Sequence, residues 1–141
     1  NVMPDEQIQD NLLTFFRFQG ETGDIVDGFV GIDRAEISDI GYKYRFSKLA
    51  PRYAAHKNTV ETDKESSLIQ AVWRYVTKSG NKEFLTIEVD GKSVLNRLEW
   101  AMEYLLNERY DEKHGLLWVA TTADWGEVQP ETPWGVELDE G

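Results

Sequence analysis

The residues best suited to chemistry lie near the C-terminal end of the sequence, in residues 118–131. This segment reads WVATTADWGEVQPE, so it brings carboxylates, an amide, hydroxyls and two tryptophans together without a helical or alternating pattern. Sugar rings present apolar C–H faces that pack on tryptophan, and their hydroxyl groups bond to carboxylate and amide groups. The composition of the segment is therefore that of a carbohydrate-binding loop.

Two carboxylates of this loop are the candidate catalytic pair. Cleavage of a glycosidic bond requires one carboxylic acid that protonates the leaving oxygen and a second carboxylate that activates water or attacks the sugar. Asp124 lies between Ala123 and Trp125, an apolar setting of the kind that favours the protonated form needed by an acid catalyst. Glu127 is the candidate second carboxylate, with Glu131 or a residue outside this sequence as alternatives. A structural interpretation stays open, in which Asp124 caps a turn and the tryptophans fill a core.

The candidate substrate-binding residues carry either an aromatic ring for stacking or a polar group for sugar hydroxyls. They are Trp118, Trp125, Gln129, Glu131, Asp63 and Trp134. Asp63 stands apart from the loop, in the stretch Thr62-Asp63-Lys64-Glu65, which has the spacing of a helix capping box. The structural interpretation of Asp63 and Glu65 is the favoured one. The alternative is that this helix start lies at the rim of a pocket and points Glu61 or Asp63 at a ligand.

Three helical segments must position these residues. The first begins with Pro4 and two acidic residues, a usual helix start, and ends at Gly20. The second begins at the capping box and ends at residues 79–81, and the third runs from Ser93 to just before Asp111. Each has apolar residues at helical spacing on one face. The second and third are predicted to pack as an antiparallel hairpin.

The sequence between and after these helices is irregular. Residues 24–32 are expected to form a short ribbon within an otherwise unpatterned stretch. The polar residues Gln19, Glu21, Asp24 and Asp27 after the first helix are interpreted as a solvated loop. Asp24, Asp27 and Asp33 could supply oxygen ligands to a metal, but their spacing fits no calcium loop. His56 and His114 have no neighbouring nucleophile and are interpreted as loop or packing residues.

The helix start at residues 59–65, the hairpin with its Gly-Asn turn, and the Ala123-Asp124-Trp125-Gly126 loop together resemble the six-hairpin glycosidases. This superfamily includes amylases similar to glycogen-debranching enzymes, rhamnosidases and trehalase-like enzymes. Several members carry an Asp-Trp pair in a loop that lines the sugar pocket. This sequence keeps Asp124 and Trp125 but differs from the family pattern on either side of the pair, which leaves open whether Asp124 donates a proton or binds a hydroxyl.

The resemblance implies a mainly α fold: αα-hairpins of an (α/α)6 toroid, incomplete here, with long irregular loops. Residues 1–141 are then a single, partial domain of a glycoside hydrolase, and its reaction is expected to invert the anomeric centre. The expected partners are an oligosaccharide or glycoside substrate and the remainder of the same domain. The alternative is a non-catalytic helical module that binds a carbohydrate or a protein.

The amino-acid composition argues against several other classes of function. Fifteen basic residues against 26 acidic residues give a net charge of -11, which disfavours nucleic-acid and anionic-membrane partners. The absence of cysteine excludes disulfides, thiolate metal sites and cysteine nucleophiles. We expect no cofactor and no metal, no membrane partner, and a soluble protein with the cytoplasm as the favoured compartment.

Overall fold

The computed structural model describes residues 3–35, 44–56, 62–118, 131–132 and 135–136. The described residues form three α-helices: α1 (Asp5–Arg17), α2 (Lys64–Ser79) and α3 (Val94–Glu108). Two short 3-10 helices, η1 (Ile32–Arg34) and η2 (Lys82–Thr86), accompany them. The α-helices occupy the segments in which apolar residues recur at helical spacing, so the prediction of the helices is confirmed.

The ends of the helices follow from local chemistry, with one exception. Gly80 ends α2 with a φ of 73°, a left-handed conformation that glycine adopts without steric cost. Ser93 caps α3, and its hydroxyl accepts a hydrogen bond from the Asn96 N–H at 3.2 Å. The exception is the start of α2. There Asp63 is the N-cap without a side-chain capping bond, so the predicted capping box is wrong.

The strands are short and antiparallel. A three-stranded sheet has the order β1 (Gly28–Gly31), β3 (Tyr53–His56), β2 (Tyr44–Arg45), and Gly28 pairs with His56 in its register. Three two-stranded ribbons follow along the chain: β4 (Glu88–Val89) with β5 (Lys92–Ser93), β6 (Tyr110–Asp111) with β7 (Leu116–Leu117), and β8 (Glu131–Thr132) with β9 (Gly135–Val136). Strand β1 lies within the ribbon expected at residues 24–32.

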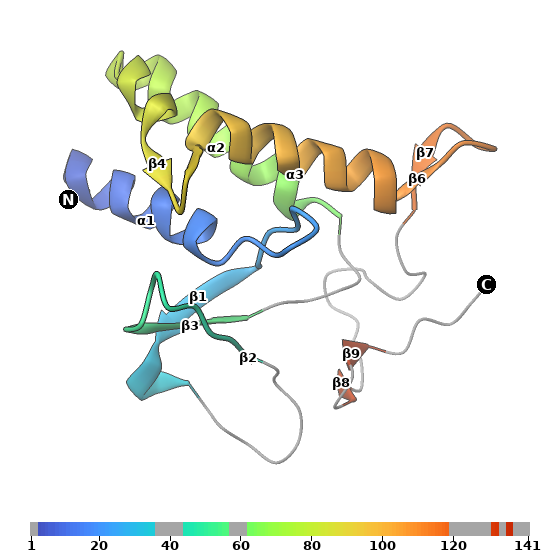
Figure 1. Ribbon diagram of the computed structural model, residues 1–141, viewed down its shortest axis with the longest axis horizontal. Coiled ribbons are helices and arrows are strands. Elements are labelled where there is room, and N and C mark those ends of the chain that lie inside the picture. Colours follow the sequence, from blue (N-terminus) through green and yellow to red (C-terminus); the bar gives the residue numbers. More distant parts are fainter. Residues whose placement is uncertain (1–2, 36–43, 57–61, 119–130, 133–134, 137–141) are drawn as a thin grey trace.

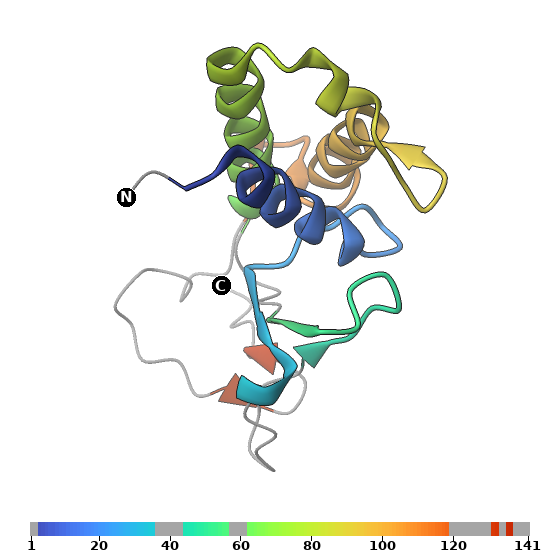
Figure 2. The same cartoon turned by 90° about the vertical axis from the view of Figure 1, so that its left-hand side faces the viewer.

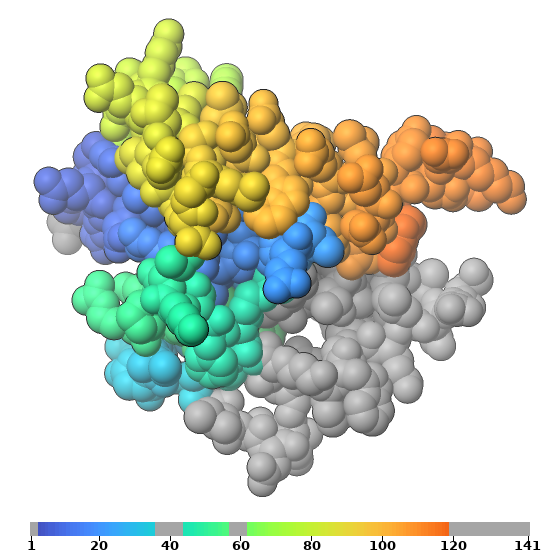
Figure 3. Space-filling view, viewed as in Figure 1, coloured from blue at the N-terminus to red at the C-terminus, as the bar shows by residue number. Residues whose placement is uncertain are grey.

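The helices form one layer and the three-stranded sheet lies on one side of it. Helices α2 and α3 pack against each other and run in opposite directions (Figure 1), so the predicted antiparallel pair is confirmed. Helix α1 lies between this pair and the sheet, as the view turned by 90° also shows (Figure 2). In the space-filling view the β6–β7 ribbon projects from the end of α3 (Figure 3).

Two apolar clusters hold the layers together. The larger one joins the three helices, and its most buried side chains include Phe16, Val72, Phe84 and Val94. The smaller one lies between the end of α1 and the sheet and contains Phe18, Val26, Ala50 and Ala55. Burial of apolar surface contributes about 25 cal/mol per Å², so these clusters stabilise both the helical layer and its contact with the sheet.

The expected (α/α)6 toroid, and with it the resemblance to six-hairpin glycosidases, is wrong. The described residues form three helices and several small antiparallel sheets, which is a mixed α/β fold and not a ring of helical hairpins. The physical reason is that a helical period identifies which residues are helical but does not specify how helices are arranged. The segments before α2 and after α3 were interpreted as loops of a toroid, but each contains strands. Strands β1 and β2 pair with β3 before α2, and β6 pairs with β7 after α3.

None of the helices in the described part of the chain is long and apolar enough to cross a membrane.

Candidate functional site

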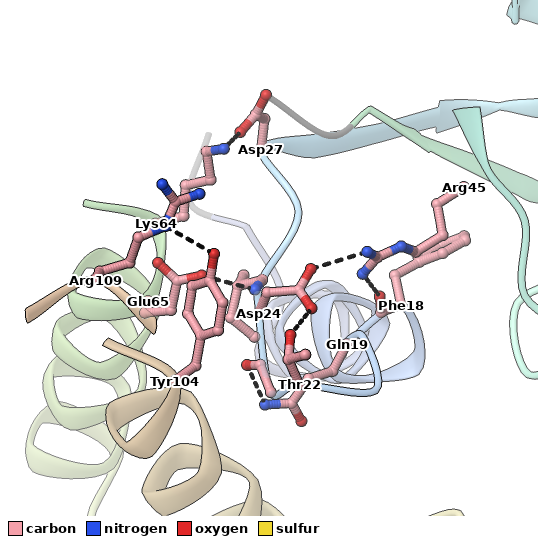
Figure 4. Close-up of polar contacts among 12 residues, drawn as sticks. Phe18, Gln19, Thr22, Asp24, Asp27, Arg45, Lys64, Glu65, Tyr104 and Arg109 are labelled. Atoms are coloured by element: carbon pink, nitrogen blue, oxygen red, sulfur yellow. Dashed lines mark hydrogen bonds and ion pairs between the residues drawn. The ribbon is translucent and has the colours of Figure 1, made fainter. Parts of the chain in front are cut away.

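A buried ion pair lies where the start of α2 meets the segment that leads into β1. The Nζ atom of Lys64 is 2.6 Å from Oδ1 of Asp27, and only 8% of the Lys64 side chain is exposed (Figure 4). The other carboxylate oxygen of Asp27 lies 3.4 Å from Nδ1 of His56, at the end of β3. The backbone N–H of Asp27 also donates to the carbonyl of His56 at 2.9 Å. Asp27 therefore connects the sheet to the helical layer.

Glu65, in the first turn of α2, is almost completely buried, with 2% of its surface exposed. Its Oε1 accepts a hydrogen bond from the backbone N–H of Ile25 at 2.9 Å. Within the described part of the chain, its Oε2 has no hydrogen-bond partner. Glu65 thus holds the segment before β1 instead of closing a capping box, and this long-range bond explains why that prediction failed.

A second buried carboxylate, Asp24, organises the turn after α1. One of its oxygens pairs with Nη2 of Arg45 at 2.8 Å, and the other accepts a hydrogen bond from the Thr22 hydroxyl at 2.7 Å. Arg45 also donates to the carbonyl of Phe18 at 2.9 Å, and burial lowers the pKa of its guanidinium. A Cβ on Gly20 would lie 2.0 Å from the Asp24 carboxylate, so the turn requires glycine there. These contacts fix the segment that carries Asp27.

The guanidinium of Arg97 supports the same turn from α3. Arg97 is 5% exposed, and its Nη1 donates to the carbonyl of Phe16 at 3.2 Å and to Oε1 of Gln19 at 3.0 Å. Its Nε and Nη2 donate to the carbonyl of Val89 at 2.9 and 2.5 Å. Gln19 returns a hydrogen bond to the carbonyl of Arg97 at 2.9 Å. Three separate segments therefore meet at one buried cation.

Trp118 lies at the end of the β6–β7 ribbon, and the guanidinium of Arg109 lies over its ring. The Cζ atom of Arg109 is 4.4 Å from the centre of the Trp118 ring, within the range of a cation–π contact. Arg109 also donates from Nε to the Tyr104 hydroxyl at 3.0 Å, and its carbonyl accepts the backbone N–H of Trp118 at 2.8 Å. Trp118 remains 41% exposed. Its ring is held by Arg109 and is still accessible to a ligand.

A pocket of about 340 Å³ opens beside the Asp27–Lys64 pair. Its volume is within the usual range for small-molecule sites. Helix α1, the segment before β1 and the first turns of α2 line it: Leu12, Phe15, Ile25, Val26, Asp27, Asp63, Lys64, Ser67, Leu68 and Ala71. The walls are apolar and the polar groups are few, a combination typical of small-molecule sites.

Of the residues predicted from sequence, the structure places Asp63 at this pocket and Trp118 and Glu131 elsewhere in the chain. Asp63 is exposed, precedes α2 and lines the pocket, so its position agrees with the alternative interpretation of it as a rim residue. Trp118 is exposed beside Arg109, and Glu131 begins β8, where it pairs with Val136 of β9. The remaining predicted residues, Asp124, Trp125, Glu127, Gln129 and Trp134, lie outside the described residues.

Sequence reasoning missed the most buried charges of this region. Asp24 and Asp27 were interpreted as part of a solvated loop, but Asp24 is 4% exposed and Asp27 pairs with the buried Lys64. One signal was present. A lysine in the first turn of a helix is unfavourable next to the positive end of the helix dipole, so Lys64 required a nearby anion.

Within the described residues, no group of three or more histidine, aspartate or glutamate side chains could hold a metal ion. No known protein family matches the chain, and neither a curated protein nor a solved structure is significantly similar to it.

Proposed function

We propose that this chain is a glycoside hydrolase, or contributes part of one, and acts on an oligosaccharide or another glycoside. The observation that carries the proposal is the pocket at the start of α2, where carboxylates and a hydroxyl meet apolar walls. Asp27, Asp63 and Ser67 supply oxygen atoms that accept hydrogen bonds from sugar hydroxyls. The side chains of Phe15 and Leu68 supply apolar surface for the less polar part of a glycoside.

The exposed ring of Trp118 adds support, because it leads directly into the segment with the candidate catalytic carboxylates. In the proposed reaction Asp124 gives a proton to the leaving oxygen, and Glu127 activates a water molecule. The bond from the anomeric carbon to the leaving oxygen breaks, and the water oxygen replaces it at that carbon. We propose an inverting reaction, with Trp125, Gln129, Glu131 and Trp134 as further contacts to the sugar.

The test is hydrolysis of a panel of oligosaccharides and aryl glycosides, measured as release of reducing ends. We expect Asp124→Asn to reduce turnover by more than about 100-fold, the lower range for removal of a general acid, while ligand binding persists. Glu112→Gln is the matched control, because Glu112 is exposed in the β6–β7 ribbon. Unchanged turnover in Asp124→Asn would remove Asp124 from the catalytic role, and no hydrolysis of any glycoside would refute the proposal.

A second candidate function is a non-catalytic carbohydrate-binding module. The observation that favours it is that Asp27, which lines the pocket, is held in an ion pair with Lys64, an arrangement that suits a fixed hydrogen-bond acceptor for a ligand. Binding of glycosides without turnover, with the same affinity in Asp124→Asn, would support the module over the enzyme.

A further inference from the structure

We infer that the pocket between α1 and α2 receives the apolar aglycone of an alkyl or aryl glycoside, an inference that rests on the proposed carbohydrate function. Polar groups gather at one end of the pocket. Asp63, Lys64 and Ser67 lie at the start of α2, and Asp27 is paired with Lys64 at 2.6 Å. The hydroxylated part of a ligand is therefore confined to this end, which we call the mouth.

The rest of the pocket is lined only by apolar side chains. Leu68 and Ala71 continue along α2 away from the mouth, and α1 and the segment before β1 contribute the other walls: Leu12, Phe15, Ile25 and Val26. An unsubstituted oligosaccharide carries hydroxyl groups on every ring, so burial among these walls would leave several of them without hydrogen bonds. A glycoside with an alkyl or aryl group avoids this cost, because its apolar part enters first.

The charges at the mouth disfavour anionic amphiphiles, such as fatty acids and alkyl sulfates, as ligands of the pocket. Two carboxylates, Asp27 and Asp63, and one ammonium, Lys64, line this end of the pocket, and Lys64 is already paired with Asp27. The whole chain carries a net charge of -11. A fatty acid or alkyl sulfate would bring a further negative charge to this position, whereas a sugar headgroup is neutral and donates hydrogen bonds to the carboxylates.

The test measures how affinity depends on the length of the apolar tail. Methyl, butyl and hexyl β-glucoside are titrated into the full chain by calorimetry, below the concentrations at which they form micelles. We expect affinity to rise about fourfold for each methylene that enters the pocket, since full burial of a methylene contributes about 0.8 kcal/mol. Hexanoate, which has a similar tail and an anionic head, is expected to bind more weakly than hexyl glucoside.

Two variants test whether the tail binds in this pocket. Ala71→Leu fills the apolar part, and Ser67→Leu places an apolar side chain at the mouth from an exposed position. Both should abolish the dependence on tail length. The matched control is Gln70→Leu, which adds the same side chain to an exposed position of α2 outside the pocket lining and should keep that dependence. Circular dichroism confirms that each variant is folded.

The results separate this inference from the proposed function. Equal affinity for all three glucosides, or a length dependence that survives in both pocket variants, overturns the inference. If hydrolysis of unsubstituted oligosaccharides is observed together with that result, the proposed function stands and only the aglycone site is rejected. If no glycoside is bound or hydrolysed, both are rejected.

Discussion

Neutralising Asp27 is the most informative perturbation of stability, because it leaves the ammonium of Lys64 without its paired carboxylate. Lys64 is 8% exposed and 2.6 Å from Asp27, whose own side chain is 22% exposed. Removal of one partner from a fully buried pair typically costs about 3–5 kcal/mol. Since Asp27 is partly exposed, we expect Asp27→Asn to lower the free energy of unfolding by about 2–3 kcal/mol. This corresponds to a decrease in Tm of roughly 6–9 °C for a chain of this length.

The assay is urea denaturation followed by fluorescence of the tryptophans and by circular dichroism. Asp10→Asn is the matched control, because it neutralises an aspartate that pairs with Arg17 at 2.8 Å while 50% exposed. Such surface pairs contribute about 0–1 kcal/mol. The double variant Asp27→Asn with Lys64→Met should regain part of the lost stability, because it also removes the buried ammonium that has lost the Asp27 carboxylate. If Asp27→Asn and Asp10→Asn destabilise the chain equally, the reasoning about the buried pair is refuted.

Three further predictions concern the segments around the site. Gly20→Ala should destabilise the chain by about 1–3 kcal/mol in thermal denaturation, because its Cβ would overlap the Asp24 carboxylate. The control is Gly28→Ala, which should be near neutral because a Cβ there meets nothing within 4 Å. Arg97→Met should cost about 2–4 kcal/mol in urea denaturation, since two buried carbonyls and the partly buried Gln19 amide oxygen lose a charged donor. A loss below about 1 kcal/mol would contradict this role. The hydrogen bond from His114 lowers the pKa of Asp111, so the β6–β7 turn is stabilised above the usual carboxyl pKa and loses this contribution as pH falls through the lowered value. An NMR titration of the Asp111 carboxyl that gives an ordinary or raised pKa would refute this contact.

The sequence was sufficient to predict the helices because their signals are local. Apolar residues recur at helical spacing, and residues such as Ser93 and Gly80 mark helix ends through their own hydrogen bonding or backbone freedom. The arrangement of the helices was not predictable in this way. Packing of α1 between the α2–α3 pair and the sheet depends on contacts between residues far apart in the sequence, which periodicity does not encode.

The strand pairing was also not predictable from the sequence. Strands β1 and β3 pair residue 28 with residue 56, and several other strands contain only two residues each. Alternation of polar and apolar residues cannot be recognised over two positions. The toroid interpretation rests on the helical signals and on the Ala123-Asp124-Trp125-Gly126 loop. The strand pairing that gives the chain its mixed α/β character has no sequence signature strong enough to oppose that interpretation.

The candidate site was predicted in part. Asp63 was considered as a rim residue because of its position before a helix, and it lines the pocket. The Asp27–Lys64 pair joins residues 37 positions apart, and the Glu65 bond to Ile25 joins residues 40 apart. Each residue taken alone has an ordinary interpretation, as a loop acid or a helix-start residue. Only the fold shows that they share one buried region.

The measurement that tests the central claim most directly is an NMR titration of the isotope-labelled chain with hexyl β-glucoside. A carbohydrate site at the start of α2 predicts that backbone amide shifts concentrate at residues lining the pocket, including Asp27, Asp63, Ser67 and Ala71. The same shifts should be absent in Ala71→Leu. Shifts confined to another surface, such as the exposed side chains Leu95, Met102 and Leu106 of α3, would contradict the account, as would the absence of any shift.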